Sequence, residues 1–180
     1  VAQEIGPIDV LVNTAGIDRV GATEEVPLED FRAVMETNYF GAIRCIQAVM
    51  PTMRRRRSGC IINVASISGR LAASPMGPYA ASKFALEAMS ECLAQEVKPF
   101  DVRVAIVEPG ITYTQMATRI SVVPGSSQYP GPGRMAALYR GVLVHPVPPT
   151  LVAEKVLEIA VGSSWQLRHL VGPDAAPFLA

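Results

Sequence analysis

The chain has 180 residues, of which 49% are hydrophobic and 18% are charged. This composition supports one folded domain, residues 1–180, with a sizeable core, and it excludes disorder as the main state. Sixteen basic residues balance sixteen acidic residues, so the chain lacks the excess positive charge that nucleic acid or an anionic membrane surface attracts. We therefore expect small, neutral partners.

The cysteines predict a reducing compartment, and the histidines and cysteines give no indication of a metal site. Cys45, Cys60 and Cys92 are odd in number and lack metal-ligand spacing, so we expect reduced thiols in a cytoplasmic protein. His145 and His169 are the only histidines, and we assign no metal site. No apolar segment is long enough to cross a bilayer and no export signal opens the chain, so we expect no membrane partner.

The first half of the chain alternates apolar strands with helical patterns. Residues 1–6 resemble the end of a helix, residues 8–12 form an apolar strand, and residues 28–53 have helical spacing that Asn38 and Gly41 interrupt. We expect two helices or one kinked helix there. Residues 60–65 are a second strand, which ends at Ser66 and is followed by a loop over 67–77.

The second half continues the alternation. We expect a helix over 78–98, a strand over 102–107, a helix over 150–162 capped by Thr150, and a strand over 167–171. The proline- and glycine-rich stretch 111–149 is a candidate substrate lid, in which the glycines between 125 and 133 are expected to open no helix. Such alternation predicts an α/β fold with a doubly wound parallel sheet, whose ligands bind beyond the carboxyl ends of the strands.

Two side chains four residues apart suggest acid–base chemistry. Tyr79 and Lys83 lie near the start of a predicted helix, which places them on one face. A free tyrosine titrates near 10. An ammonium about 5 Å away at an effective dielectric of about 20 favours the phenolate by roughly 3 kcal/mol. We therefore expect a Tyr79 pKa lowered by about two units. The pair alone is a weak signal, since an ordinary amphipathic helix also supplies it.

Further segments in a fixed order make the pattern specific. They are Asp9-Val10-Leu11-Val12-Asn13-Thr14-Ala15-Gly16, Asn38-Tyr39-Phe40-Gly41, Ile62-Asn63-Val64-Ala65-Ser66, Tyr79-Ala80-Ala81-Ser82-Lys83-Phe84-Ala85 and Val107-Glu108-Pro109-Gly110. Together they resemble the short-chain dehydrogenase/reductase family over nearly the whole chain. The resemblance implies a Rossmann-like fold and hydride transfer between a nicotinamide cofactor, NAD or NADP, and an alcohol or carbonyl.

The resemblance also implies roles for individual residues. Tyr79 would be the general acid or base, Ser66 would bind the substrate oxygen, and Lys83 would lower the Tyr79 pKa and bind the nicotinamide ribose. Asn38 would hold a water that links Lys83 to solvent. The remaining cofactor contacts implied by the resemblance are Asn13, Ala15 and Gly16 on the adenosine side, and Pro109, Gly110, Thr112 and Thr114 at the nicotinamide end.

Three departures from the family pattern stand out. Thr14 replaces a common asparagine, and Thr112 replaces a common valine or isoleucine at a position whose backbone meets the carboxamide. The sequence also contains no Gly-x-x-x-Gly-x-Gly turn, which holds the pyrophosphate in this family. We therefore expect an N-terminally truncated member that lacks the first strand–helix units. The strand at 8–12 would then keep an unpaired edge, and the chain would bind dinucleotide poorly.

Three functional alternatives remain at this stage. The first is an NAD(P)-dependent oxidoreductase of small, neutral, apolar alcohols or carbonyls, in which Met76 and Met116 line the substrate pocket. The second is a catalytically inactive binding or assembly module of the same fold. The third, an epimerase or dehydratase of the extended family, is disfavoured because only about seventy residues follow Pro109. Excess apolar surface over 78–98 favours a homodimer or homotetramer.

Overall fold

A computed structural model describes residues 6–121 and 127–180. The helix end expected at 1–6 lies almost wholly outside the described residues, as does Gly125 of the expected irregular stretch.

The centre of the molecule is a parallel sheet in the order β1-β2-β3-β4. The strands are β1 (Val10–Asn13), β2 (Gly59–Val64), β3 (Val102–Pro109) and β4 (Arg168–Val171). Each strand pairs with the next one in the chain, so that Asn13 lies beside Asn63 and Val64 beside Val107. The expected α/β fold with a parallel sheet is therefore confirmed, with strand ends shifted by one or two residues.

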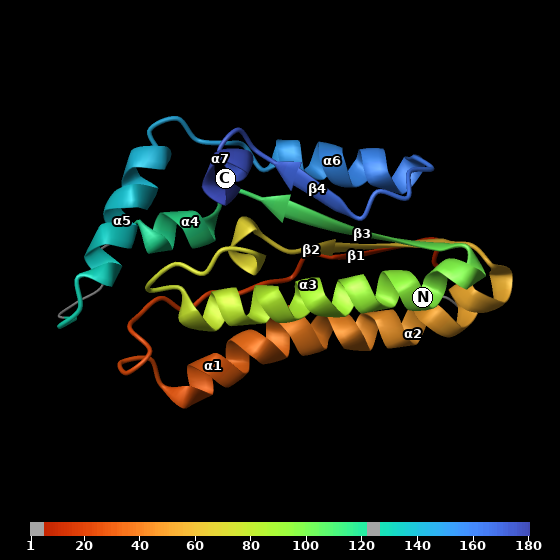
Figure 1. Cartoon of the computed structure of the whole chain (residues 1–180), viewed down its shortest axis with the longest axis horizontal. Coiled ribbons are helices and arrows are strands. Elements are labelled where there is room, and N and C mark those ends of the chain that lie inside the picture. Colours follow the sequence, from red (N-terminus) through yellow and green to blue (C-terminus); the bar gives the residue numbers. More distant parts are fainter. Residues whose placement is uncertain (1–5, 122–126) are drawn as a thin grey trace.

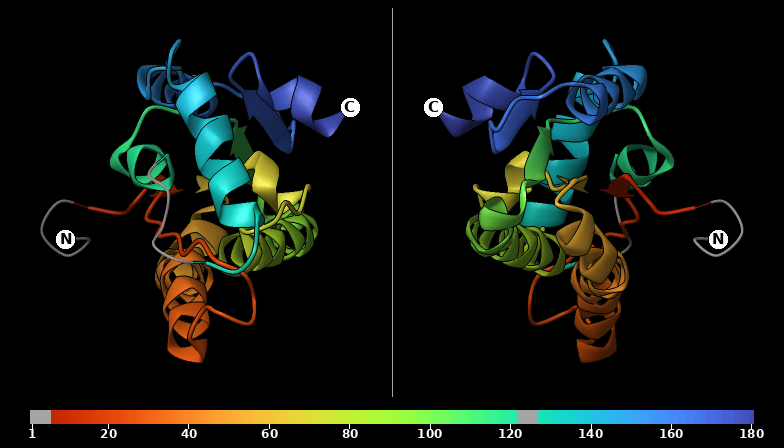
Figure 2. Two further views of the ribbon diagram at one scale, coloured as in Figure 1. Left: turned by 90° about the vertical axis from the view of Figure 1, so that its left-hand side faces the viewer. Right: turned by 90° about the vertical axis from the view of Figure 1, so that its right-hand side faces the viewer.

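Helices cover both faces of this sheet. One face carries α2 (Gly41–Arg56) and α3 (Gly77–Val97), with α1 (Leu28–Met35) extending that layer, and the other face carries α6 (Thr150–Val161). Figure 1 and the end-on views of Figure 2 show three layers, with the sheet between the two helical layers. This is the doubly wound arrangement, which places all strand carboxyl ends at one rim.

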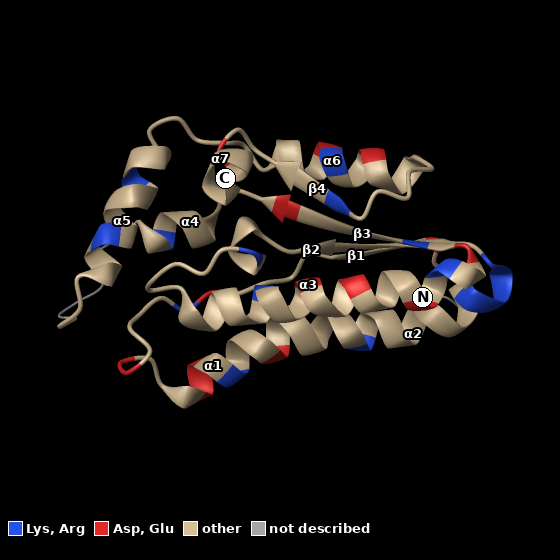
Figure 3. Ribbon diagram, viewed as in Figure 1, with Lys and Arg blue, Asp and Glu red and all other residues tan. Residues whose placement is uncertain are grey.

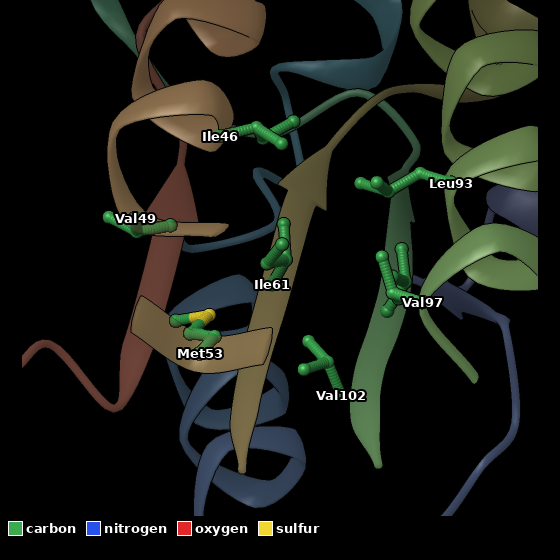
Figure 4. Packing of buried hydrophobic residues seen from close by; sticks show 8 residues of the cluster. Ile46, Val49, Met53, Ile61, Leu93, Val97 and Val102 are labelled. Carbon is green, nitrogen blue, oxygen red and sulfur yellow. The ribbon is translucent and has the colours of Figure 1, made fainter. Parts of the chain in front are cut away.

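Each face of the sheet has its own apolar core. Residues of α2 and α3 pack on one face of β2 and β3 (Figure 4): Ile46, Val49, Met53, Leu93 and Val97 against Ile61, Val102 and Val104. On the opposite face, Ile159 of α6 packs against Cys60, Ile62, Ala105, Val107 and Val171. Alternate residues of β2 and β3 thus point into the two cores, which explains why both strands are nearly continuous apolar runs.

The interruption expected within 28–53 is a π turn. The π-helix η1 (Glu36–Phe40) joins α1 to α2, and it carries the buried Asn38. Its backbone bonds skip one residue more than those of an α-helix, as shown by the bond from the Gly41 N–H to the Glu36 carbonyl. Such turns reorient side chains locally and are frequent at functional sites.

The segment 111–149 contains more helix than expected. It forms α4 (Gln115–Ile120) and α5 (Gly131–Val142), so the expectation that the glycines near 133 open no helix is wrong. Pro132 lies in the first turn of α5, where its missing N–H is no loss. Thr114 caps α4 through its side chain, whereas Thr150 is the first residue of α6 and not its cap.

Short elements complete the chain. The loop expected over 67–77 begins with the 3-10 turn η2 (Ile67–Gly69), a second 3-10 turn, η3 (Lys98–Phe100), follows α3, and α7 (Ala175–Leu179) follows β4.

Charged residues are distributed unevenly along the molecule. The arginine run 54–57 ends α2 at the side opposite the strand carboxyl ends (Figure 3). Arg56 pairs with Asp9, and Arg57 pairs with Asp101 at 2.7 Å. The run is a solvated helix end, as its charge suits the carbonyl end of a helix.

Strand β1 lies at one edge of the sheet. Among the described residues it pairs only with β2, which leaves its other side without a neighbour, and Val12 is 37% exposed. No helix within the described ranges combines the length and apolarity needed to cross a bilayer.

Candidate active site

A cavity of about 480 Å³ lies at the carboxyl ends of β1, β2 and β3. Its size falls within the range of small-molecule sites, and helices α4, α5 and α6 close it from the side opposite α3. The predicted site residues that line it are Gly16, Ser66, Tyr79, Lys83, Pro109, Gly110, Thr112 and Thr114. Segments far apart in the sequence therefore meet in one space.

Tyr79 and Lys83 lie on the first turns of α3. The Lys83 ammonium is 5.6 Å from the centre of the Tyr79 ring and donates a hydrogen bond to the Val64 carbonyl at 2.8 Å. That bond reaches the last residue of β2, so it fixes the lysine beside the strand end. The expected juxtaposition of the two side chains is thus present.

Ser66 occupies the turn that follows β2. Its hydroxyl accepts the Ser68 N–H at 3.1 Å and caps η2. Gly69 brings this turn close to α3, because a Cβ at Gly69 would lie 2.8 Å from Glu87 Cγ and 3.1 Å from the Lys83 carbonyl. Only glycine allows this approach. The close packing sets Ser66 beside Tyr79, whose pKa responds to the serine hydroxyl.

The acidity of Tyr79 differs from the expectation. Burial raises the pKa of Tyr79 to about 12, while the Ser66 hydroxyl acts to lower it. The expected lowering by Lys83 is therefore wrong for the chain described here. Lost solvation of the phenolate is the largest effect, and the charge of Asp18 acts in the same direction. Tyr79 consequently holds its proton at neutral pH.

Lys83 is itself strongly affected by burial. Lost solvation lowers the pKa of Lys83 to about 8, and the Glu87 carboxylate opposes this by raising it. The lysine is 4% exposed. It therefore carries its charge at pH 7 but loses it within reach of mildly alkaline conditions.

Asn38 locks the loop after β1 to the helices. Its side-chain oxygen accepts the Ile17 N–H at 2.8 Å, and its amide donates to the Ile17 carbonyl and to Ser82 Oγ, both at 2.9 Å. Ser82 Oγ donates in turn to the Tyr79 carbonyl at 2.7 Å. Both amide hydrogens are thus used within the protein, and the role expected for Asn38 in holding a water stays a prediction.

Two predicted cofactor contacts lie outside the cavity lining. The Asn13 amide donates to Asn63 Oδ1 at 2.8 Å, and Asn63 donates to Ser90 Oγ at 2.8 Å. Asn13 thereby joins β1 to β2 and α3. Ala15 is exposed and does not line the cavity. Their cofactor roles stay predictions.

The turn after β3 is held on both sides. The Gly110 N–H donates to the Val171 carbonyl at 2.9 Å, and the Ile111 N–H donates to Asp174 Oδ2 at 2.7 Å. Thr112 forms an isolated bridge with Val147. These bonds fix the backbone of the turn along the cavity wall.

The residues around this turn fit the nicotinamide end of a dinucleotide. A Cβ at Gly16 would lie 3.6 Å from Asn38 Oδ1 and 3.8 Å from Lys83 Nζ, so the glycine leaves space beside the lysine. Gly110 and Thr112 face the same cavity. The described residues therefore suit a nicotinamide riboside, and Lys83 offers it an ammonium.

Several lining residues were missed by sequence reasoning. Tyr139 of α5 and Val152 and Val156 of α6 face the cavity. Tyr139 is packed near Tyr79, and burial raises its pKa as well. The sequence did not predict the helix of Tyr139, because glycines and prolines open it. Val152 and Val156 have an ordinary four-residue helical spacing, from which their common face could have been predicted.

Metal-ligating side chains do not gather near the cavity. In the described parts of the chain, no three His, Cys, Asp or Glu residues are placed to hold a metal ion.

Comparison with known proteins shows to which family the chain is similar. The sequence profile described as short chain dehydrogenase matches residues 1–122. The chain is 40% identical over 126 residues to retinol dehydrogenase 8 of Bos taurus, covering 70% of this chain and 40% of that protein. The crystal structure of a short-chain dehydrogenase from Streptomyces avermitilis matches with a TM-score of 0.82 at 35% identity, covering 99% of this chain and 65% of that one.

A structure of NAD⁺-bound xylitol dehydrogenase also matches, with a TM-score of 0.82 at 25% identity over 95% of this chain and 70% of that one. The chain spans 40% to 65% of the length of the first two proteins compared. The matching profile, fold and order of segments show that this chain belongs to the short-chain dehydrogenase/reductase family.

Proposed function

We propose that the chain carries the catalytic half of an NAD(P)-dependent oxidoreductase that interconverts an alcohol and a carbonyl. The observation that carries the proposal is the convergence of Ser66, Tyr79 and Lys83 on one cavity. A phenol, a hydroxyl and an ammonium around one space can bind a carbonyl oxygen and transfer a proton to it. The bound nicotinamide would supply the hydride.

Each residue has a distinct task in this proposal. Tyr79 gives its proton to the carbonyl oxygen during reduction and takes it back during oxidation. Ser66 donates a hydrogen bond to the same oxygen. Lys83 binds the nicotinamide ribose and stabilises the phenolate left on Tyr79, while Asn38 holds the loop that carries Gly16.

The protonation state of Tyr79 favours reduction at neutral pH. A pKa raised to about 12 by burial keeps the phenol protonated, and this is the form that donates to a carbonyl. The charged Lys83 can then attract the phenolate as it forms. Oxidation requires the opposite form of Tyr79 and is expected to need alkaline conditions.

The substrate is proposed to be an apolar alcohol or ketone. Met76, Met116, Ile120 and Val152 line the cavity together with Tyr139. Among the described residues, Lys83 is the one charged side chain of this lining, so a cationic substrate would lack a partner. Retinol dehydrogenase 8, one of the compared relatives, is named after retinol, an apolar alcohol.

NAD and NADP are both retained as proposed cofactors. A compared structure holds NAD⁺, and the turn from Pro109 to Thr114 together with Lys83 would hold the nicotinamide end, with Gly16 on the adenosine side. A binding or assembly module without catalysis is the second candidate. It is favoured by the outer side of β1, which has no neighbouring strand among the described residues.

Turnover measurements separate the two candidates. The purified chain is mixed with an apolar ketone and saturating NADPH or NADH, and the loss of reduced cofactor is followed. We expect slow reduction that Tyr79→Phe lowers by about a hundredfold or more, while Tyr139→Phe, which removes a second phenol from the same cavity, retains activity. Dinucleotide binding without turnover under every condition would favour the binding module.

Association and location complete the proposal. Phe40 and Phe84 are 45% and 42% exposed on the helical layer, which supports a homodimer or homotetramer formed through this layer. Light scattering tests it. Cys45, Cys60 and Cys92 are free thiols, which supports a cytoplasmic location.

A further inference from the structure

Five charged side chains gather behind the cavity and take no part in the chemistry proposed above. Glu87 and Glu91 come from α3, Glu108 from β3, Arg168 from β4, and Arg70 follows η2. We call these five residues the charged cluster. Two of its elements, α3 and β3, lead directly into segments that line the cavity, and η2 follows Ser66.

The two inner carboxylates of the charged cluster are buried and poorly satisfied. Glu108 is 0% exposed and neither of its oxygens has a hydrogen bond, and Glu87 is 4% exposed with Oε1 unpartnered. Buried carboxylates without partners are costly and rare. A role for both carboxylates would explain why the fold retains them.

The arginines approach these carboxylates from two sides. Arg70 Nη1 lies 3.7 Å and Arg168 Nε 3.5 Å from Glu108 Oε1. Arg168 Nη2 also donates to Glu87 Oε2 at 3.2 Å and pairs with Glu91. Charge attraction therefore joins β4 to α3, and it joins the end of η2 to β3.

The positions of these residues in the chain connect the charged cluster to the site. Glu108 directly precedes Pro109 and Gly110, and Glu87 lies one helical turn after Lys83. Gly69, next to Arg70, packs against Glu87 Cγ at a distance that leaves no room for a Cβ. A shift of either carboxylate would thus be felt at the Ser66 turn and at the turn after β3.

We propose that Glu87 and Glu108 are positioning residues for the reaction proposed above. Through Arg70 and Arg168, they hold the Ser66 turn and the turn after β3 in register with the helix that carries Tyr79 and Lys83. The inference rests on the proposed function for its catalytic meaning. The structural part of the proposal is that buried charges couple the two turns. This part can be tested without measuring turnover.

The charge balance of the cluster makes this coupling sensitive to pH. Three carboxyl groups face two arginines, and Lys83 approaches Glu87 along α3. Burial and the nearby Glu108 raise the pKa of Glu87 to about 7. Protonated Glu87 leaves the two arginines balanced by Glu91 and Glu108. Ionisation of Glu87 near pH 7, followed by loss of the Lys83 charge near pH 8, leaves more negative than positive charge in this buried region and should loosen both turns.

Amide hydrogen exchange measured by NMR tests the coupling in the full chain. The reporters are the Gly69 N–H, bonded to the Ser66 carbonyl at 2.8 Å, and the Gly110 N–H, bonded to the Val171 carbonyl at 2.9 Å. We expect Glu108→Gln to speed exchange at both reporters by about tenfold or more. The control, Glu91→Gln, removes a half-exposed charge from the same arginine and should change exchange less than about twofold.

Unchanged exchange in Glu108→Gln, or an equal change in Glu91→Gln, would overturn the proposal. Should Glu108→Gln fail to fold, Arg70→Gln serves instead, because Arg70 is 45% exposed and its loss leaves Glu108 with one arginine. We expect the same acceleration at both reporters. A change confined to Gly69 would contradict the coupling.

The pH dependence gives a second arm. After correction for the intrinsic effect of pH on exchange, the wild-type chain should show faster exchange at both reporters as pH rises through 7. Glu87→Gln should lose this step, and a step that persists would refute the role of Glu87. Turnover is measured separately. A wild-type chain without activity would contradict the proposed function. Amide exchange that does not change together at the two reporters would contradict this inference.

Discussion

The carboxylate of Asp174 accepts the backbone N–H of Ile111 at 2.7 Å, although the two residues lie 63 positions apart. Asp174 precedes α7, and Ile111 directly follows the turn after β3. The bond therefore ties the C-terminal segment to the cavity wall at the proposed nicotinamide end. Because its acceptor is charged, it is expected to be stronger than a bond between neutral groups.

Removal of this carboxylate should free the turn. We expect Asp174→Ala to lower the free energy of unfolding by about 1.5–3 kcal/mol, measured by urea titration, and to speed exchange of the Ile111 amide. Asp174→Asn retains an acceptor oxygen and should lose less than half as much. Equal losses in the two variants would show that the hydrogen bond is not the cause.

Gly110 should tolerate no side chain while Asp174 is present. A Cβ at Gly110 would lie 2.2 Å from Asp174 Oδ1 and 2.5 Å from its Cγ. We expect Gly110→Ala to destabilise the chain by about 2 kcal/mol or more, and to cost clearly less in an Asp174→Ala background. Thermal unfolding of all four proteins gives the coupling. Gly133→Ala, with nothing within 4 Å of its Cβ, is the neutral control.

Ser82 should matter for activity beyond its effect on stability. Its hydroxyl is fully buried and links the Asn38 amide to the Tyr79 carbonyl. We expect Ser82→Ala to cost about 1–3 kcal/mol of stability and to lower kcat. Ser90→Ala is the control, because the Ser90 hydroxyl likewise accepts a bond from Asn63 and donates to the Leu86 carbonyl. We expect it to cost similar stability with little loss of kcat. Similar losses of kcat in both would contradict a specific role.

Lys83 should make the chain more stable as alkaline pH is approached. Burial lowers the pKa of Lys83 to about 8 from 10.5, so between these values the unfolded chain binds more protons than the folded chain. The free energy of unfolding therefore rises with pH in this window, by up to about 3 kcal/mol. We expect the difference between wild type and Lys83→Met, measured at pH 7.5 and 10, to show this rise. If the difference in free energy of unfolding is the same at both pH values, the lysine is in contact with water and the prediction is wrong.

The sheet and its rim were predictable because local patterns decide them. Nearly continuous apolar runs such as residues 60–65 favour strands buried on both faces, and the alternation with helices indicates the parallel topology. The meeting of Ser66, Tyr79 and Lys83 follows from that topology, since the strand–helix unit of β2 and α3 delivers all three to one rim.

Other features depend on tertiary contacts that no local pattern carries. Asp174 lies in a Gly-Pro-Asp turn, a common loop sequence, and its partner Ile111 is set only by the pairing of β4 with β3. The pKa of Tyr79 was expected to fall because an ammonium lies nearby, but the depth of burial, which decides the outcome, depends on α4 and α5 covering the cavity. Helix α5 was hidden because Gly131, Pro132 and Gly133 are typical of loops as well as of first helical turns.

The chain-order pairing of the sheet bears on how the protein acquires its structure during translation. Every strand finds its neighbour in the segment synthesised immediately before or after it, as in the pairing of Val10 with Cys60 and of Gly59 with Val102. Among the four described strands, none pairs with a strand farther along the chain than the next one. Ribosome-bound chains that end shortly after β3 can thus already hold three of the four described strands, with β4 added later.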